Sequence, residues 1–136
     1  MPAAQNGDGA AIECFENAEA ICVSRDRVAP VKTMNDLVAL WSNAFEMTDD
    51  SRLIAVNREA HRLREIDLDE RYYRTVQDLE ARFPSGVPSL AKSRRFAVCG
   101  DHCFVADVAV VGDVQLVNES ETPVHISAGI VLEGKR

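Results

Sequence analysis

The sequence has no excess of basic residues, no long apolar run and no paired-cysteine pattern, and each absence excludes a class of protein. Its 136 residues carry 15 Lys and Arg against 22 Asp and Glu, which gives a formal net charge of −7. An acidic chain lacks the basic face that contacts the phosphates of a nucleic acid, so we expect no nucleic-acid partner. No apolar run approaches the roughly 20 residues that cross a bilayer, so we expect no membrane partner either.

The N-terminus and the cysteines favour a cytoplasmic protein. Residues 1–8 are small and polar and are expected to be disordered, and the first nine residues lack the charged and apolar regions of a signal peptide. Cys99 and Cys103 flank His102, but this spacing matches no common zinc pattern and no second pair completes a site. We therefore expect no metal site. The cysteines are expected to be buried apolar thiols: Cys14, Cys22, Cys99 and Cys103.

Against this acidic background, three cations gather in the segment from Ser24 to Leu37, SRDRVAPVKTMNDL. Arg25, Arg27 and Lys32 lie within eight residues of one another, and Pro30 holds this segment off the helix that follows. Arginine forks and a lysine point charge both bind phosphate oxygens, so the spacing suits a phosphate-bearing ligand. A plain surface turn is the alternative, and it is the commoner explanation for such a run taken alone.

A helix is predicted directly after these cations. Thr33, followed three residues later by Asp36, has the spacing of a capping box, and we interpret Asn35 and Asp36 first as helix-start residues. Trp41 is expected in the core. Lys32 would lie just before the helix, where free amides and the helix dipole favour an anion. The predicted apolar stripe comprises Leu37, Leu40, Trp41, Ala44 and Phe45.

Several shorter elements are predicted around this helix. A helical turn is expected at residues 10–15 and a short buried strand at residues 20–23, which ends where the basic loop begins. Residues 52–56 predict another strand, and the charged residues 57–65 a solvated excursion. A second helix is expected to start near Asp69 and to stop at Pro84. Its apolar face would carry Tyr72, Val76, Leu79 and Phe83.

The C-terminal section repeats every six residues from Phe96 to Glu119. Such repeats, with small or turn-forming residues at the corners, predict a β-helix, and the edge of a small β-sandwich is the alternative. Four hexads make little more than one three-sided coil, so this short β-helix should lean on the preceding helices or on another subunit. The apolar column contains Val98, Phe104, Val110 and Leu116. The corner columns contain Gly100, Ala106, Gly112 and Asn118, followed in turn by Asp101, Asp107, Asp113 and Glu119.

Three of these stretches carry a resemblance to a known enzyme family. Residues 25–37, RDRVAPVKTMNDL, with residues 79–90, LEARFPSGVPSL, and residues 98–101, VCGD, resemble the UDP-glucose pyrophosphorylases, that is, the UTP–glucose-1-phosphate uridylyltransferases. The resemblance implies an α/β fold, in which residues 9–90 are the end of a nucleotidyltransferase α/β domain and residues 91–136 a short left-handed β-helix. The family's larger N-terminal part, with its glycine-rich nucleotide loop, is absent.

The resemblance also implies a reaction and a site. The family converts glucose-1-phosphate and UTP to UDP-glucose and pyrophosphate, with Mg²⁺ as the implied cofactor and the metal-holding acid outside this chain. Lys32 corresponds to the catalytic lysine at the nucleotide phosphates, and Arg25 and Arg27 to residues that organise this anionic substrate site. Val28 and Met34 stand where the family usually has an aromatic and a small polar residue.

Two functions stay open. The chain is either the C-terminal portion of a UTP–glucose-1-phosphate uridylyltransferase or a non-catalytic oligomerisation or binding module derived from that family. The first is expected to be inactive alone and to bind UTP, glucose-1-phosphate or UDP-glucose once a missing catalytic domain completes the site in trans. The second would form a homo-oligomer through the β-helix and keep the basic loop only as a relic. Replacing Lys32 by Ala separates the two, because only the first needs this side chain for ligand binding.

Overall fold

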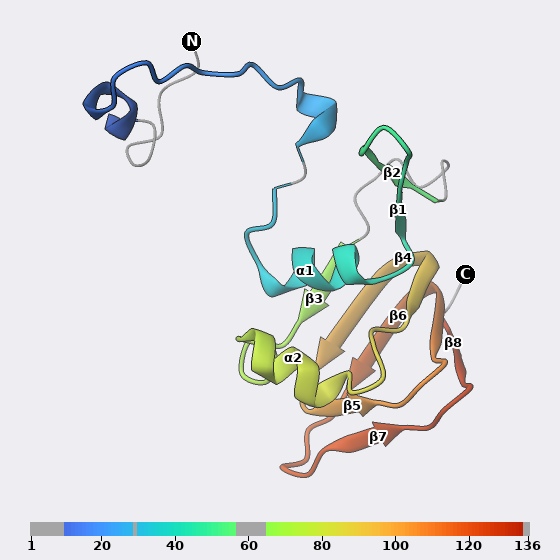
Figure 1. Cartoon of the computed structure of the whole chain (residues 1–136). Helices are drawn as coiled ribbons and strands as arrows, with labels where there is room; N and C mark the ends of the chain where they lie inside the picture. Colours follow the sequence, from blue (N-terminus) through green and yellow to red (C-terminus); the bar gives the residue numbers. More distant parts are fainter. Residues whose placement is uncertain (1–9, 29, 57–64, 135–136) are drawn as a thin grey trace.

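The computed structural model describes residues 10–28, 30–56 and 65–134 (Figure 1). An extended N-terminal segment leads into two short helices and a body of mostly parallel strands. Within these ranges no helix has the length and apolarity needed to span a membrane. The elements are, in order, the 3₁₀ turns η1 (Ala10–Cys14) and η2 (Arg25–Arg27), then α1 (Met34–Trp41), β1 (Phe45–Met47), β2 (Leu53–Ala55), β3 (Glu65–Leu68), α2 (Val76–Arg82), β4 (Ser89–Cys99), β5 (His102–Phe104), β6 (Ala109–Val117), β7 (Val124–Ile126) and β8 (Val131–Glu133).

The body of the protein is a stack of parallel strands. β3, β4, β6 and β8 form one parallel sheet in that order, and β5 pairs in parallel with β7, whereas β1 and β2 form a separate antiparallel hairpin. From β4 onwards, each strand therefore pairs with the strand two places later in the sequence: β4 with β6, β5 with β7, and β6 with β8. Val98 pairs with Leu116, three six-residue repeats further on, which matches the predicted period. The predicted mixed α/β class is confirmed.

The predicted apolar column forms the centre of this stack. Val98, Phe104 and Val110 are buried, and Leu116 packs against the same core. Phe104 lies 5.2 Å from the ring of Phe83 and 5.8 Å from that of Phe96, measured between ring centroids. Aromatic side chains bury large apolar areas, so these contacts join α2 to the parallel strands. The six-residue pattern thus identified the core side chains correctly.

Both helices start with a complete capping box. In α1 the Thr33 hydroxyl accepts the amide of Asp36 at 3.2 Å, and the Asp36 carboxylate accepts the amide of Thr33 at 3.0 Å. Thr75 and Asp78 repeat this arrangement at α2. The predicted cap of the first helix is confirmed. The second helix begins at Val76 and not near Asp69 as predicted, because residues 69–75 form turns instead.

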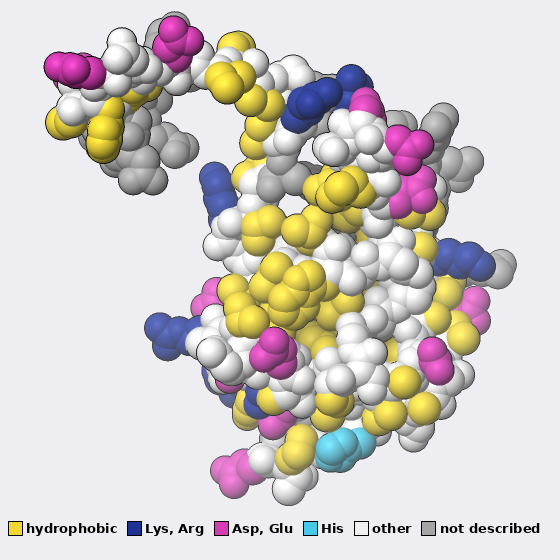
Figure 2. Space-filling view, in the orientation of Figure 1, with side chains coloured by type: hydrophobic (Ala, Val, Ile, Leu, Met, Phe, Trp, Pro, Cys, Tyr) yellow, Lys and Arg dark blue, Asp and Glu magenta, His cyan; other side chains and the backbone are white. Residues whose placement is uncertain are grey.

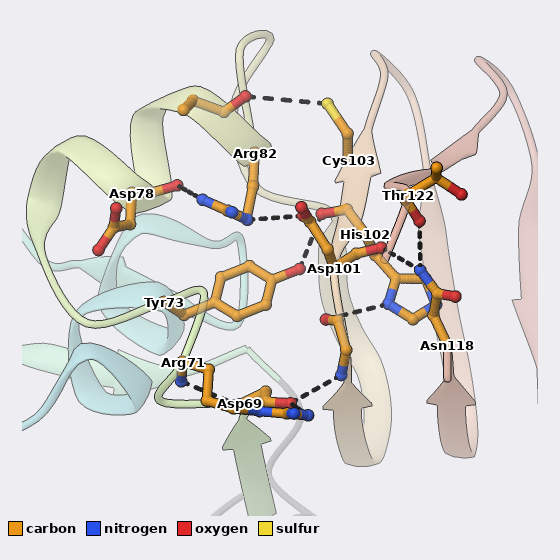
Figure 3. A network of polar contacts seen from close by, with 12 residues as sticks. Asp69, Arg71, Tyr73, Asp78, Arg82, Asp101, His102, Cys103, Asn118 and Thr122 are labelled. Carbon is orange, nitrogen blue, oxygen red and sulfur yellow. Dashed lines mark hydrogen bonds and ion pairs between the residues drawn. The ribbon is translucent and has the colours of Figure 1, made fainter. Parts of the chain in front are cut away.

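A polar network holds these turns and α2 against the parallel strands (Figure 3). Asp69 accepts the amide of Gly100 at 2.8 Å and an Arg71 guanidinium N–H at 2.7 Å. The Tyr73 hydroxyl donates to the carbonyl of His102 at 2.8 Å, and burial raises the pKa of this tyrosine. The guanidinium of Arg82, the last residue of α2, forms an ion pair with the carboxylate of Asp101 at 2.9 Å. Because all these groups meet at one end of the stack, α2 is fixed to it by polar as well as apolar contacts.

The prediction that Trp41 belongs to the core is wrong. Its side chain is 46% exposed, whereas α1 buries Val38. The helix ends at Trp41, and the Ser42 hydroxyl donates to the carbonyl of Ala39 at 2.6 Å. Residues 44 and 45 therefore follow the helix and cannot extend its apolar stripe. α1 packs on β3 through its buried face. Its opposite side is exposed, and Figure 2 shows hydrophobic side chains gathered on the visible surface near α1.

The predicted buried strand at residues 20–23 is also absent. Ile21 is 88% exposed, Phe15 is 69% exposed and Val23 is exposed as well. Figure 1 shows this segment running away from the body, and a strand cannot form without a neighbour to share its hydrogen bonds. The predicted turn at residues 10–15 is present as η1. Residues 1–8 and most of the predicted charged excursion, residues 57–64, lie outside the described ranges.

The cysteines are not the buried thiols that we predicted. Cys14, Cys22 and Cys99 are exposed and Cys103 is partly exposed, and all are free. Cys14 and Cys22 lie on the extended N-terminal segment. Cys99 ends β4 next to the buried Val98, so the alternation of a strand turns its side chain outward.

Candidate functional site

Lys32 lies exposed immediately before α1 and lines two hollows, one on each side of the helix start. The first hollow has a volume of about 540 Å³ and an apolar lining apart from Lys32, Asn35 and Asp36. The second has a volume of about 290 Å³ and a mixed polar and apolar lining. Lys32 can therefore reach a ligand in either. The second hollow is lined by Lys32, Thr33, Met34, Asn35, Leu68, Glu70, Tyr73 and Arg74.

The backbone amides at this helix start already bind a carboxylate of the chain itself. The same Asp36 oxygen accepts the amides of Lys32 and Thr33, both at 3.0 Å. These two hydrogen bonds, that from Lys32 first, lower the pKa of Asp36. The predicted contribution of the Lys32 and Thr33 amides is thus taken up by Asp36, whereas the Lys32 ammonium group stays available to a ligand.

Asn35 and Asn43 anchor the two ends of the α1 region. The Asn35 side-chain oxygen accepts the amide of Leu68 in β3 at 3.1 Å. That of Asn43 accepts the amides of Leu90 and Ala91 in β4 at 3.0 and 3.2 Å. The sequence suggested only a helix-start role for Asn35. The contact with β3 means that it also sets where α1, and with it Lys32, lies on the sheet.

Replacing Asn35 by Ala should destabilise the protein by about 1–2 kcal/mol, because the partly buried amide of Leu68 loses its acceptor. Asn35→Asp keeps an acceptor oxygen and places a negative charge in the first helical turn, so it should cost less than half as much. Urea denaturation of the three proteins measures both effects. Equal losses in the two variants would contradict the assigned hydrogen bond.

Arg25 and Arg27 lie in the 3₁₀ turn η2, and Val28, which follows this turn, lines the larger hollow. Two backbone hydrogen bonds close the turn. The amide of Arg27 donates to the carbonyl of Ser24 at 3.0 Å, and the amide of Val28 donates to the carbonyl of Arg25 at 3.1 Å. Neither arginine is among the residues that line the hollows beside Lys32. Their predicted role at an anionic substrate stays a prediction.

Sequence reasoning missed Arg74, which lines the second hollow together with Lys32. A signal was present in the sequence, since Arg74 precedes Thr75 and Asp78 as Lys32 precedes Thr33 and Asp36. The amide of Arg74 also donates to the Asp78 carboxylate, at 3.2 Å. What the sequence could not supply is the packing of α1 on β3, which brings the two segments to one hollow.

Cys99, His102 and Cys103 do not form a metal site. His102 is buried, with its Nδ1 3.4 Å from the carbonyl of Gly100, and the Cys103 thiol donates to the carbonyl of Ala81 at 3.8 Å. Over residues 10–28, 30–56 and 65–134, no three His, Cys, Asp or Glu side chains gather as possible metal ligands.

Comparison with known proteins gives one consistent answer. The family model for UTP–glucose-1-phosphate uridylyltransferase matches residues 4–110. UTP–glucose-1-phosphate uridylyltransferase 2 of Dictyostelium discoideum is 30% identical over 127 residues, which are 93% of this chain and 25% of that protein. The enzyme of Hordeum vulgare is 32% identical over the same share of this chain and 26% of its own length.

Solved structures agree with the sequence comparisons. A mutant UDP-glucose pyrophosphorylase from Leishmania major in complex with UDP-glucose is 39% identical, with a TM-score of 0.76 over 93% of this chain and 27% of that one. UDP-glucose phosphorylase from Trypanosoma brucei is 41% identical, with a TM-score of 0.75 over 93% of this chain and 28% of that one. The chain thus spans about a quarter of the length of the proteins it matches.

Proposed function

Because the chain belongs to the UTP–glucose-1-phosphate uridylyltransferase family, we propose that it is the C-terminal portion of such an enzyme and carries its active-site lysine. The match of nearly the whole chain to about a quarter of each relative carries this proposal. The complete enzyme would convert glucose-1-phosphate and UTP to UDP-glucose and pyrophosphate. This portion alone is expected to be inactive.

The role proposed for Lys32 follows from the charge that the reaction develops. A phosphate oxygen of glucose-1-phosphate attacks the α-phosphorus of UTP, and the bond from that phosphorus to the departing pyrophosphate breaks. Negative charge grows on the phosphoryl oxygens and on the leaving group, where a fixed cation stabilises it. Lys32 suits this role because Asp36 holds its backbone amide while the side chain is exposed. Arg25 and Arg27 would join it once the N-terminal segment is packed.

The family reaction also implies Mg²⁺. The described residues contain no cluster of metal-ligating side chains, so a magnesium ion would be held by the nucleotide and by residues outside them. The contribution proposed for this chain is positive charge from lysine and arginine, and no step of its own depends on the metal.

A partner that completes the site is supported by the exposed apolar groups around Lys32. The N-terminal segment leaves Phe15, Ile21 and Val23 uncovered, and the larger hollow has an apolar lining. Such surfaces mark contacts with other protein. We infer that the catalytic domain, supplied in trans or by the rest of a longer chain, covers them.

The parallel stack is proposed to be the short left-handed β-helix predicted for residues 91–136, with residues 9–90 as the remnant of the nucleotidyltransferase domain. The pairing of β4 with β6 from Arg95↔Asp113 to Cys99↔Val117, in which partners are three hexads apart, supports this. The exposed Val131 on β8, at the edge of the sheet, supports the second candidate function, a non-catalytic module that forms a homo-oligomer. Free thiols fit a reducing compartment, in keeping with the predicted cytoplasmic location.

The proposed function predicts that calorimetric titration with UDP-glucose, and with UTP and Mg²⁺, shows saturable binding that Lys32→Ala weakens at least ten-fold, since a charge-assisted contact to phosphate is lost. Lys92→Ala is the matched control, because it removes an exposed lysine from β4. Turnover should appear only when the family's N-terminal catalytic portion is added. Equal binding by both lysine variants, or turnover by the isolated chain, would contradict the proposal.

A further inference from the structure

The second hollow beside Lys32 is bordered by two copies of one local arrangement. In each, a basic residue precedes a capping threonine, and the aspartate three residues after that threonine accepts the basic residue's own amide. The distances are 3.0 Å for Lys32 and 3.2 Å for Arg74. The two backbone positions are thereby fixed, and the two basic side chains belong to the lining of the same hollow.

The charges at this hollow differ from those of the rest of the chain. The protein is acidic, with a net charge of −7, yet this hollow contains two cationic side chains and one carboxylate, that of Glu70. Among the described residues, the larger hollow is lined by one cation, Lys32, together with Asn35, Asp36 and otherwise apolar side chains. Two cations from separate segments suit a ligand with charge spread over two phosphoryl groups, because each group can contact its own cation.

We propose that Lys32 and Arg74 together form a site for a diphosphate, either free pyrophosphate or the diphosphate of a nucleotide sugar. The inference rests on the proposed function and adds Arg74 as a second cation that binds this ligand. The amides of Lys32 and Thr33 and those of Arg74 and Thr75 take no part, because Asp36 and Asp78 already accept them. Glu70 lines the same hollow and lowers the affinity by repulsion.

Pyrophosphate titration of the 136-residue chain at low ionic strength tests the site directly, since salt screens exposed charges. Arg74→Ala should weaken binding about ten-fold, as Lys32→Ala should. Arg74→Lys should recover part of the loss, because it keeps the charge but not the planar fork. Glu70→Gln should tighten binding about two- to three-fold by removing a repulsive charge. Circular dichroism of each variant checks that it is folded.

Arg94→Ala is the matched control. It removes an arginine whose side chain is largely exposed and pairs with Asp113 on the sheet, away from the hollow, so pyrophosphate affinity should stay unchanged. A parallel titration with UDP-glucose distinguishes the two sources of diphosphate. Stronger effects of Arg74→Ala on UDP-glucose than on pyrophosphate assign the site to the nucleotide sugar, and the reverse assigns it to the leaving group.

Two results would overturn the inference: no saturable binding of either diphosphate by the folded chain, or equal affinities of the Arg74→Ala and Arg94→Ala variants. The proposed function fails separately. If Lys32→Ala weakens the binding of UDP-glucose or of pyrophosphate and Arg74→Ala changes the affinity for neither, the two-cation site is wrong and the proposed function stands. If the family's catalytic portion added in trans gives no turnover with the unmodified chain, the proposed function is wrong even where both cations bind pyrophosphate.

Discussion

Replacing Gly100 by Ala is expected to destabilise the protein by about 3–5 kcal/mol. Gly100 has a φ of +89°, a conformation that costs an alanine about 1–2 kcal/mol. An added Cβ would also overlap the backbone carbonyl of Asn118. That carbonyl cannot move freely, because Asn118 is held by two hydrogen bonds. Its backbone amide donates to the carbonyl of Cys99 at 2.8 Å, and its side-chain amide donates to the carbonyl of Asp101 at 2.8 Å. The substitution must therefore separate two neighbouring turns of the stack.

Gly86→Ala is the control for this effect. Gly86 has a similar φ of +94°, but no other atom lies within 4 Å of the position that its Cβ would take. It should therefore show only the conformational cost, about 1 kcal/mol. Urea denaturation followed by circular dichroism measures both variants. Equal losses would show that the close approach of residues 100 and 118 contributes nothing to stability.

This close approach was visible in the sequence as a repeat. Gly100 and Asn118 belong to one corner column, and Val98 and Leu116 to the apolar column, each pair three hexads apart. Strands stacked in register place such residues side by side, so the period predicted the buried apolar column and the pairing of Gly100 with Asn118. The predicted corner at Gly112 and Asp113 instead lies within β6. The capping box at Thr33 was predictable for a similar reason, since it depends on residues three positions apart.

Features that depend on distant neighbours were not predictable. The strand expected at residues 20–23 has suitable residues, but pairing needs a second strand, and the described ranges contain none beside it. Trp41 has the spacing of a core residue on a helix that ends before its stripe is complete. Arg74 joins Lys32 only because α1 packs on β3. In all three cases tertiary contacts, or their absence, decided the outcome, and local spacing does not contain that information.

The acid stability of the protein should depend on Asp69. Its carboxylate accepts hydrogen bonds from Arg71 and from the amide of Gly100, and it is mostly buried. The side-chain hydrogen bonds from Arg71, more than any other contact, hold the pKa of Asp69 well below its usual range. A depressed pKa means that the folded state binds this proton less readily than the unfolded state does. The resulting stabilisation is complete above the unfolded pKa, about 4, and is lost as the pH falls towards the folded pKa.

Replacing Asp69 by Asn should therefore lower the free energy of unfolding by about 2 kcal/mol at pH 7, because the charge-assisted bonds to Arg71 are lost. The difference from the unmodified protein should shrink progressively below about pH 4, where the unfolded state takes up the proton. Urea denaturation at about pH 7, 4 and 3 measures this. Part of the acid sensitivity should remain in the variant, since the pKa values of Asp36 and Asp78 are also lowered by their capping hydrogen bonds. A difference that stays constant over this whole pH range would contradict the assigned pKa shift, and it would mean that the Asp69→Asn substitution disturbs the turn in some way other than by removing a charge.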